Sequence, residues 1–200
     1  MQPSEKEELR KIFKILQDID YIRPTEIPDI PLYMDQVTTF MEDRLKGCKR
    51  HEDDKILTKT MINNYTKNKL VPPPNKKKYS KDHLLLFIFI YYFKDFLSIG
   101  DIETLFKPLT ENHFNVEEGT GMEDIYKGVY KMIRTQIDGL SKELIRGYQN
   151  TATKISENDE DNEYLRTFAY ICQLSFDVYM KKMLIEGLID GLSEKNGNEK

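Results

Sequence analysis

The residues best suited to chemistry in this sequence are the lysines and asparagines between Lys55 and His83. This segment holds eight lysines against one acid, Asp82, and therefore a net charge of +7. The whole chain carries −4, which leaves −11 on the remainder. A basic segment on an otherwise acidic protein favours a local binding site for a polyanion. Charge alone leaves the alternative of a solvated, lysine-rich loop open.

The first part of this segment predicts a short helix that starts at Thr58. At about 100° per residue, its apolar side is formed by Met61, Ile62 and Tyr65. The polar side carries Lys59, Thr60, Asn63 and Lys67, with Asn64 at its edge. Asparagine can read adenine in the DNA major groove, whereas lysines and hydroxyls more often hold phosphates. Thr58 can cap the helix, and the amide end of a helix suits a phosphate. The alternative for both asparagines is solvation of an exposed face.

A proline turn and a second basic stretch follow this helix. Prolines 72–74 end it, because proline lacks the amide donor and crowds the preceding turn. We interpret the next residues, Asn75-Lys76-Lys77-Lys78, as the tip of a wing that reaches the DNA backbone or minor groove. Tyr79 is expected to lay its ring on the core, and Ser80 to cap the following helix. Both complete the predicted set of DNA-binding residues.

These elements, in this order, resemble the DNA-binding end of the MerR-type winged helix-turn-helix regulators. The marks are Ile62 with Tyr65, then Leu70-Val71-Pro72-Pro73, Lys78-Tyr79-Ser80 and Ser98-Ile99-Gly100-Asp101-Ile102. The chain is similar still more closely to a bacterial family of unknown function with this MerR-like core, marked by the runs LYMDQVTTF and LTKTMINNY. The resemblance spans Ile30 to Phe106. It implies sequence-specific DNA binding, transcriptional control and a homodimer.

The sequence departs from the MerR pattern at three places. The connection over residues 46–56 is much longer than the usual tight turn. Asn63 and Asn64 stand where the pattern has arginine and an aromatic residue, so the family's contacts do not transfer to them. The chain is slightly shorter before Ser98, and the usual glycine there is missing.

Helices on either side of the basic segment are predicted to support it. Residues 32–45 predict a first helix, with inward side chains at Tyr33, Val37, Phe40, Met41 and Leu45. Residues 84–96 are apolar almost all round, so this helix must be covered on several sides. Ser98 predicts the cap of a short helix that Pro108 stops.

We predict an all-α chain with a winged helix-turn-helix core, a small β-wing and a C-terminal helical hairpin. Residues 1–29 would form an N-terminal helix and an extended, proline-containing strap, and residues 30–108 the MerR-like core. Residues 109–200 predict two long helices, over 124–148 and 164–192, for dimerisation or for a partner or small-molecule effector. Their aromatic and methionine side chains at helical spacing are more typical of a core than of a pocket.

Other classes find little support in the sequence. Two distant cysteines favour a reduced, cytoplasmic protein, and the longest apolar run, residues 84–93, is too short to span a membrane. Cys48 and His51 lack further metal ligands nearby, and no catalytic or nucleotide motif is present. We therefore expect neither an enzyme nor a cofactor. The alternative function is a protein-interaction module of the same fold that has lost DNA binding.

Overall fold

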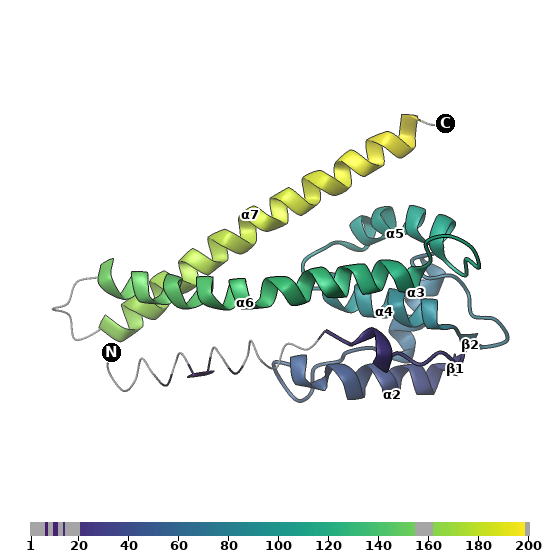
Figure 1. Cartoon of the computed structure of the whole chain (residues 1–200), viewed down its shortest axis with the longest axis horizontal. Coiled ribbons are helices and arrows are strands. Elements are labelled where there is room, and N and C mark those ends of the chain that lie inside the picture. Colours follow the sequence, from purple (N-terminus) through teal and green to yellow (C-terminus); the bar gives the residue numbers. More distant parts are fainter. Residues whose placement is uncertain (1–6, 8–9, 12–13, 15–20, 155–161, 199–200) are drawn as a thin grey trace. The chain divides into compact units, whose positions relative to one another are not determined.

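The structure is a computed structural model that describes residues 7, 10–11, 14, 21–154 and 162–198. It is mostly helical with one small two-stranded sheet, as predicted (Figure 1). The elements are η1 (Pro24–Glu26), β1 (Leu32–Tyr33), α2 (Met34–Leu45), η2 (Lys46–Cys48), α3 (Lys59–Lys67), β2 (Lys78–Tyr79), α4 (Lys81–Phe93), α5 (Ile99–His113), α6 (Met122–Lys154) and α7 (Asn162–Asn198). The predicted N-terminal helix lies largely outside the described residues.

The chain divides into two compact units. The larger consists of Asp18–Met132 and Ile189–Lys200, and the smaller of Met1–Gln17 and Ile133–Leu188. The larger unit contains every element from η1 to α5 and the start of α6. All residues predicted to bind DNA therefore belong to one unit. No described helix combines the length and the apolar run that crossing a membrane requires.

Helix α4 is the centre of the larger unit. Its residues from His83 to Ile90 are all buried, as expected for a helix that is apolar on every side. Aromatic rings from three other elements pack against α4. The ring centroid of Tyr79 in β2 lies 5.8 Å from that of Phe87, and the centroid of Phe106 in α5 lies 6.2 Å from that of Phe93. The third is Tyr126 of α6, 5.6 Å from Phe89.

The segment before β1 is part of the core, which corrects the prediction of an extended surface strap. Ile22 and Ile27 are buried, and Pro24 opens the 3-10 turn η1. Proline suits the first position of a helical turn, because its fixed φ matches and its missing donor is not needed there. The Tyr126 hydroxyl donates to the Ile22 carbonyl at 2.5 Å, and Tyr21 stacks on Tyr92 with ring centroids 4.1 Å apart.

The first predicted helix begins two residues late, at Met34, because Leu32 and Tyr33 form a strand instead. They pair antiparallel with β2 in the register Leu32↔Tyr79 and Tyr33↔Lys78. Alternation along a strand buries Leu32 and turns Tyr33 outward, where it is 53% exposed. The prediction that Tyr33 points inward was therefore wrong. The inward residues Val37, Met41 and Leu45 are confirmed, and Phe40 is half-buried.

Helix α5 runs through Pro108 to His113, so the prediction that this proline ends it was wrong. Ile102 and Phe106 are buried on the side that faces the core, which favours continuation of the helix. Side chains also bond the carbonyls around the proline. Thr110 Oγ1 donates to the Phe106 carbonyl at 3.0 Å, and Asn112 Nδ2 donates to the Pro108 carbonyl at 2.9 Å.

In the smaller unit, helices α6 and α7 pack through two tyrosines. The rings of Tyr148 and Tyr170 are buried and 5.5 Å apart, and the Tyr170 hydroxyl donates to the Leu144 carbonyl at 2.7 Å. Both helices extend beyond the predicted ranges, since no proline interrupts them. Helix α7 leaves large apolar side chains exposed, among them Phe176 at 64% and Leu184 at 66%.

We predict that Tyr126→Phe lowers the free energy of unfolding by about 1 kcal/mol, because it removes the bond to the Ile22 carbonyl and keeps the ring. Urea unfolding measures this change. Tyr130→Phe is the matched control, since the Tyr130 hydroxyl has no hydrogen bond to the described part of the chain. Equal losses in both variants would contradict the prediction.

Candidate nucleic-acid interface

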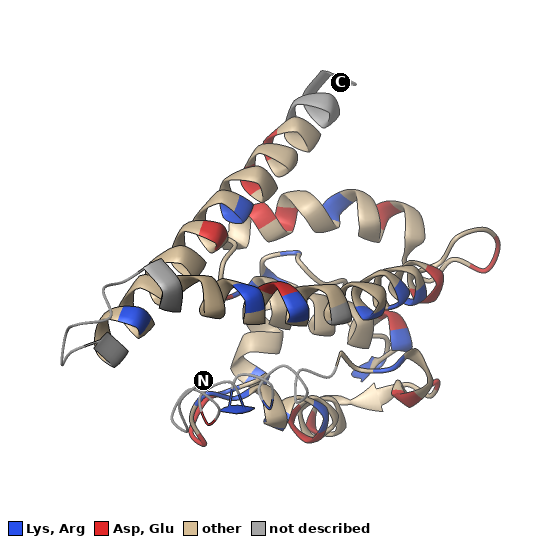
Figure 2. Cartoon of the chain, turned by 60° about the vertical axis from the view of Figure 1, so that its left-hand side comes forward, with Lys and Arg blue, Asp and Glu red and all other residues tan. Residues whose placement is uncertain are grey.

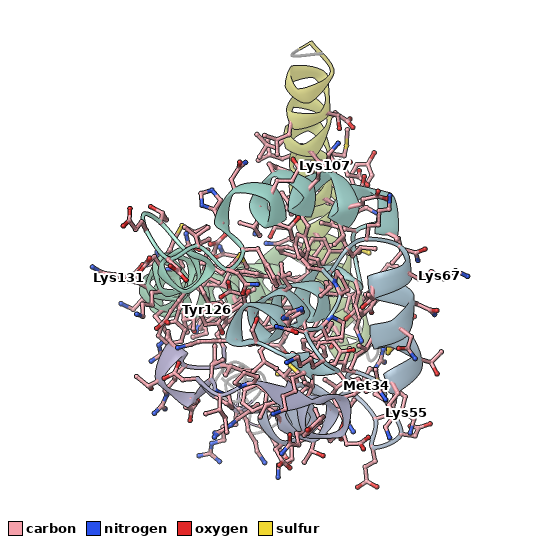
Figure 3. All side chains as sticks on the ribbon, turned by 90° about the vertical axis from the view of Figure 1, so that its right-hand side faces the viewer. Met34, Lys55, Lys67, Lys107, Tyr126 and Lys131 are labelled. Atoms are coloured by element: carbon pink, nitrogen blue, oxygen red, sulfur yellow. The ribbon has the colours of Figure 1, made fainter. Side chains whose placement is uncertain are left out.

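Helix α3 has the two faces that its sequence predicts. The Thr58 hydroxyl caps it by accepting from the Met61 backbone N–H at 3.2 Å. Ile62 and Tyr65 are buried at 0% and 6% exposure, which anchors the apolar side. The exposed face carries Lys59, Thr60, Asn63, Asn64 and Lys67. Figure 3 shows the Lys67 side chain extending away from the ribbon into solvent.

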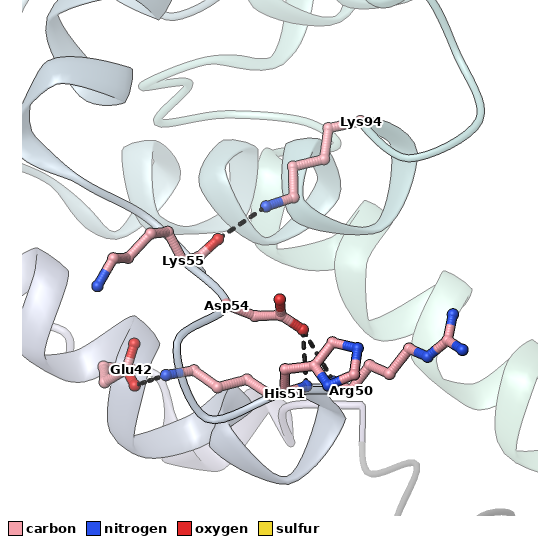
Figure 4. Close-up of polar contacts among 7 residues, drawn as sticks. Glu42, Arg50, His51, Asp54, Lys55 and Lys94 are labelled. Atoms are coloured by element: carbon pink, nitrogen blue, oxygen red, sulfur yellow. Dashed lines mark hydrogen bonds and ion pairs between the residues drawn. The ribbon is translucent and has the colours of Figure 1, made fainter.

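The long connection between α2 and α3 is held by side chains that bond backbone groups (Figure 4). The Asp54 carboxylate accepts from the backbone N–H groups of His51 at 2.9 Å and Arg50 at 3.1 Å. These bonds, the one from His51 foremost, lower the pKa of Asp54. Lys94 Nζ, at the end of α4, donates to the carbonyls of residues 55 and 56, each at 3.2 Å. The start of α3 is thereby tied to α4.

Helix α3 ends in a Schellman motif with a lysine at its left-handed position. The Leu70 N–H donates to the Tyr65 carbonyl at 2.9 Å, and the Lys69 N–H to the Thr66 carbonyl at 3.1 Å. Lys69 has a φ of 58°. Leu70 is fully buried, which fixes the chain as it leaves α3 toward the prolines.

The predicted wing tip, Asn75–Lys78, is a tight turn. The Lys78 N–H donates to the Asn75 carbonyl at 2.9 Å, and Lys76 and Lys77 have φ of 47° and 64°. Positive φ at both central residues defines a type I′ turn, which favours Asn-Gly. The strand after the turn pairs with β1, whereas Asn75 and Lys78 form only an isolated bridge. The sequence did not indicate that β1 would be the partner.

Lysine stands at three backbone positions where glycine or asparagine is favoured. Among the described residues, the non-glycine positions with positive φ are Lys69, Lys76, Lys77 and Asn115. The left-handed conformation costs a residue with a Cβ about 1–2 kcal/mol. Strained backbone of this kind concentrates at functional sites. The lysine charges at the end of α3 and in the wing turn therefore come at a cost in stability.

Tyr79 and Ser80 connect the wing to the start of α4. Tyr79 is buried at 3% exposure, and its ring lies edge-on to His83 with centroids 5.4 Å apart. The Ser80 backbone N–H and hydroxyl both bond His83 Nδ1, at 3.0 and 2.8 Å. This leaves the imidazole proton on Nε2, which donates to the Pro72 carbonyl at 3.2 Å. His83, which sequence analysis passed over, therefore joins the proline turn to the start of α4.

A groove of about 660 Å³ brings the predicted residues of α3 and the wing together. Lys59, Asn63 and Lys67 of α3 line it, with Lys77 and Tyr79 of the wing. Tyr33, Met34 and Asp35, at the start of α2, form the remaining wall with Thr66 and Pro74. Sequence analysis missed the contribution of α2 because the β1–β2 pairing that places it has no local signal.

The remaining predicted residues lie outside the groove lining. Thr60, Asn64 and Lys76 are exposed beside it, whereas Thr58 is bonded within α3 as its cap. Lys78 Nζ lies 5.2 Å from the centroid of the Tyr33 ring, a cation–π contact on the wing. The structure thus separates groove-lining residues from flanking ones.

The lysines of the segment differ in their pairing. Lys59 forms an ion pair with Asp35, and Lys81 is bound by Asp29 and Glu123. Lys67, Lys69, Lys76 and Lys77 form no ion pair with any described residue. Acidic residues of the unit lie on α5 and in the loop that follows it, and also on α2 and the connection to α3 (Figure 2). Lysines without an ion pair to a described residue therefore gather at the end of α3 and in the wing turn.

Metal ligands do not gather anywhere in the described chain. No group of three or more His, Cys, Asp and Glu side chains lies close enough to hold an ion there. Cys48 is half-buried and His51 is exposed.

Comparison with known proteins identifies a family. Residues 22–129, more than half of the chain, match the model of a domain of unknown function (DUF1836). No curated protein and no solved structure matches the sequence. The matched residues cover nearly all of the larger unit up to Met132, including α3, the wing and the first turns of α6.

We predict that Lys76→Asn combined with Lys77→Gly raises the free energy of unfolding by about 1–2 kcal/mol, because Asn-Gly relieves the left-handed strain. Urea unfolding tests this. Lys107→Gln, in a helix without such strain, should leave the free energy of unfolding nearly unchanged. A loss of stability in the turn variant would show that the turn is not type I′.

We predict that His83 makes the protein less stable as the pH falls below about 6.5. Burial lowers the pKa of His83 against the weaker opposing effect of the Pro72 carbonyl, so the folded protein keeps this imidazole neutral. The unfolded chain binds a proton there first, and the free energy of unfolding therefore falls on acidification. Unfolding at pH 7.5, 6.5 and 5.5 should show a smaller drop in His83→Gln than in the exposed control His51→Gln.

Proposed function

The chain belongs to the DUF1836 family, and for this member we propose binding of double-stranded DNA and control of transcription. Helix α3 would enter the major groove, with Asn63 at base edges and Lys59 and Lys67 on phosphates. The wing turn would reach the adjacent backbone or minor groove. The observation that carries this proposal is the single groove that α3 and the wing share.

The arrangement suits a duplex for a geometric reason. The polar face of a short helix can lie in a major groove only if nothing beside it blocks the approach. Asn63, Asn64 and Lys67 are all exposed, and so are the wing residues Lys76 and Lys77. The order of helix, turn and wing also resembles that of MerR-type regulators, which supports a winged helix-turn-helix arrangement here.

The distribution of charge adds support. Lys67, Lys69, Lys76 and Lys77 have no acidic partner among the described residues, and three of them occupy strained backbone positions. Free cations on a protein of net charge −4 attract a polyanion at a defined place. A solvated lysine loop would give no reason for lysine to replace glycine or asparagine at these positions.

The smaller unit would provide a dimer contact or bind a partner. Helix α7 exposes large apolar side chains, and such a surface commonly marks an interaction site. This observation also favours the alternative function, a protein-interaction module that does not bind DNA. A cavity of about 360 Å³ beside Tyr148, Tyr170 and Leu174 is of a size that suits a small apolar effector.

We predict that Lys76→Asn with Lys77→Gly weakens binding to all duplexes alike. The variant keeps the wing turn and removes two cations, so the slope of log affinity against log salt should become shallower by up to about 1.8. Fluorescence anisotropy with a labelled duplex, between about 50 and 200 mM salt, measures both quantities.

The matched control removes two exposed lysines elsewhere in the same unit, Lys107→Gln with Lys131→Gln. Lys131 points to the side of the unit opposite Lys67 (Figure 3). The control should keep the wild-type slope.

In selection from random duplex DNA, Asn63→Ala should reduce the preference for particular sequences, by about 1–3 kcal/mol at the contacted base. Salt-independent or undetectable binding of the wild type would favour the interaction module instead.

A further inference from the structure

We propose that Asp35 is a selectivity residue of the interface: it holds Lys59 and repels phosphate, so that the groove rejects DNA that offers backbone charge alone. The inference rests on the proposed function, since it assigns a role at the same surface. Asp35 was not among the DNA-binding residues predicted from the sequence. That prediction gave the helix now labelled α2 only a supporting role.

The position of Asp35 carries the argument. Its side chain is 73% exposed, and it is the sole acid among the described residues that line the groove. Its carboxylate pairs with Lys59 Nζ across the groove from α2 to α3. The other charged residues of the lining, Lys67 and Lys77, are cations. One carboxylate thus lines the same groove as three lysines.

The fold holds Asp35 at this position. The pairing of Tyr33 with Lys78 ties the residues just before α2 to the wing. The Tyr33 backbone N–H donates to Gln36 Oε1 at 2.8 Å, which fixes the first turn of α2. Asp35 lies within that turn, so the backbone that carries its carboxylate is held at the groove.

Stability does not explain this ion pair. Both partners are more than half exposed, and exposed pairs contribute little to folding. The pair has a larger effect on a ligand, because Lys59 is the first residue of α3, where the helix amide end would otherwise attract a phosphate. A DNA backbone that approaches must separate Lys59 from Asp35 and come close to the carboxylate. Like charges brought together in this way suppress wrong partners.

The test compares Asp35→Asn with Asp29→Asn. The two variants change the net charge equally. Asp29 is also exposed and also pairs with a lysine, Lys81, but it lies outside the groove lining. With a random-sequence duplex as the probe, Asp35→Asn should bind about two- to fivefold more tightly than Asp29→Asn. Its salt slope should be steeper by about 0.9, one additional phosphate contact.

Two further measurements complete the test. The ratio of affinities for a selected duplex and the random duplex should fall in Asp35→Asn and stay at the wild-type value in Asp29→Asn. In a Lys59→Gln background, Asp35→Asn should have a smaller effect, because the pair is already broken. Thermal unfolding checks that each variant is folded at the temperature of the assay.

The outcomes separate this inference from the proposed function. If the wild type binds DNA with strong salt dependence but Asp35→Asn behaves like Asp29→Asn, Asp35 has no role in selectivity and the inference is overturned. Weaker binding of random DNA by Asp35→Asn overturns it as well. If the wild type binds no duplex at low salt, the proposed function itself fails.

Discussion

The burial of α4 is the constraint on which the rest of the larger unit depends. A helix with apolar residues on all sides cannot leave any face in water, so elements from distant parts of the sequence must surround it. Tyr79 of β2, Phe106 of α5 and Tyr126 of α6 each contact it through a ring. The matched family region extends to residue 129, and so includes the turn of α6 that carries Tyr126.

The candidate interface is built outward from this centre by polar contacts at both ends of α4. His83, at its start, bonds Ser80 and the Pro72 carbonyl, which holds the wing to the proline turn. Lys94, at its end, bonds the backbone that leads into α3. A single buried helix is therefore bonded at one end to the wing and the proline turn and at the other to the segment that leads into α3.

The candidate interface combines exposed lysines with one carboxylate, Asp35. Lysines in strained positions supply part of the attraction, at a cost in stability that the core must offset. The Asp35–Lys59 pair lies between α2 and α3, at the point where helix amides and a lysine coincide. In the function that we propose, this arrangement would keep the affinity for DNA in general low relative to the affinity for one sequence.

The sequence by itself determined the local features: α3 with its cap at Thr58, its buried Ile62 and Tyr65 and its exposed polar face, and the all-round burial of α4. These follow from periodicity and capping within a few residues of chain. Tertiary structure alone decided the strand at Tyr33, the place of Asp35 in the groove and the continuation of α5 through Pro108. Each of these three features depends on partners far along the chain or on packing that outweighs a local preference. No short stretch of residues encodes such long-range contacts.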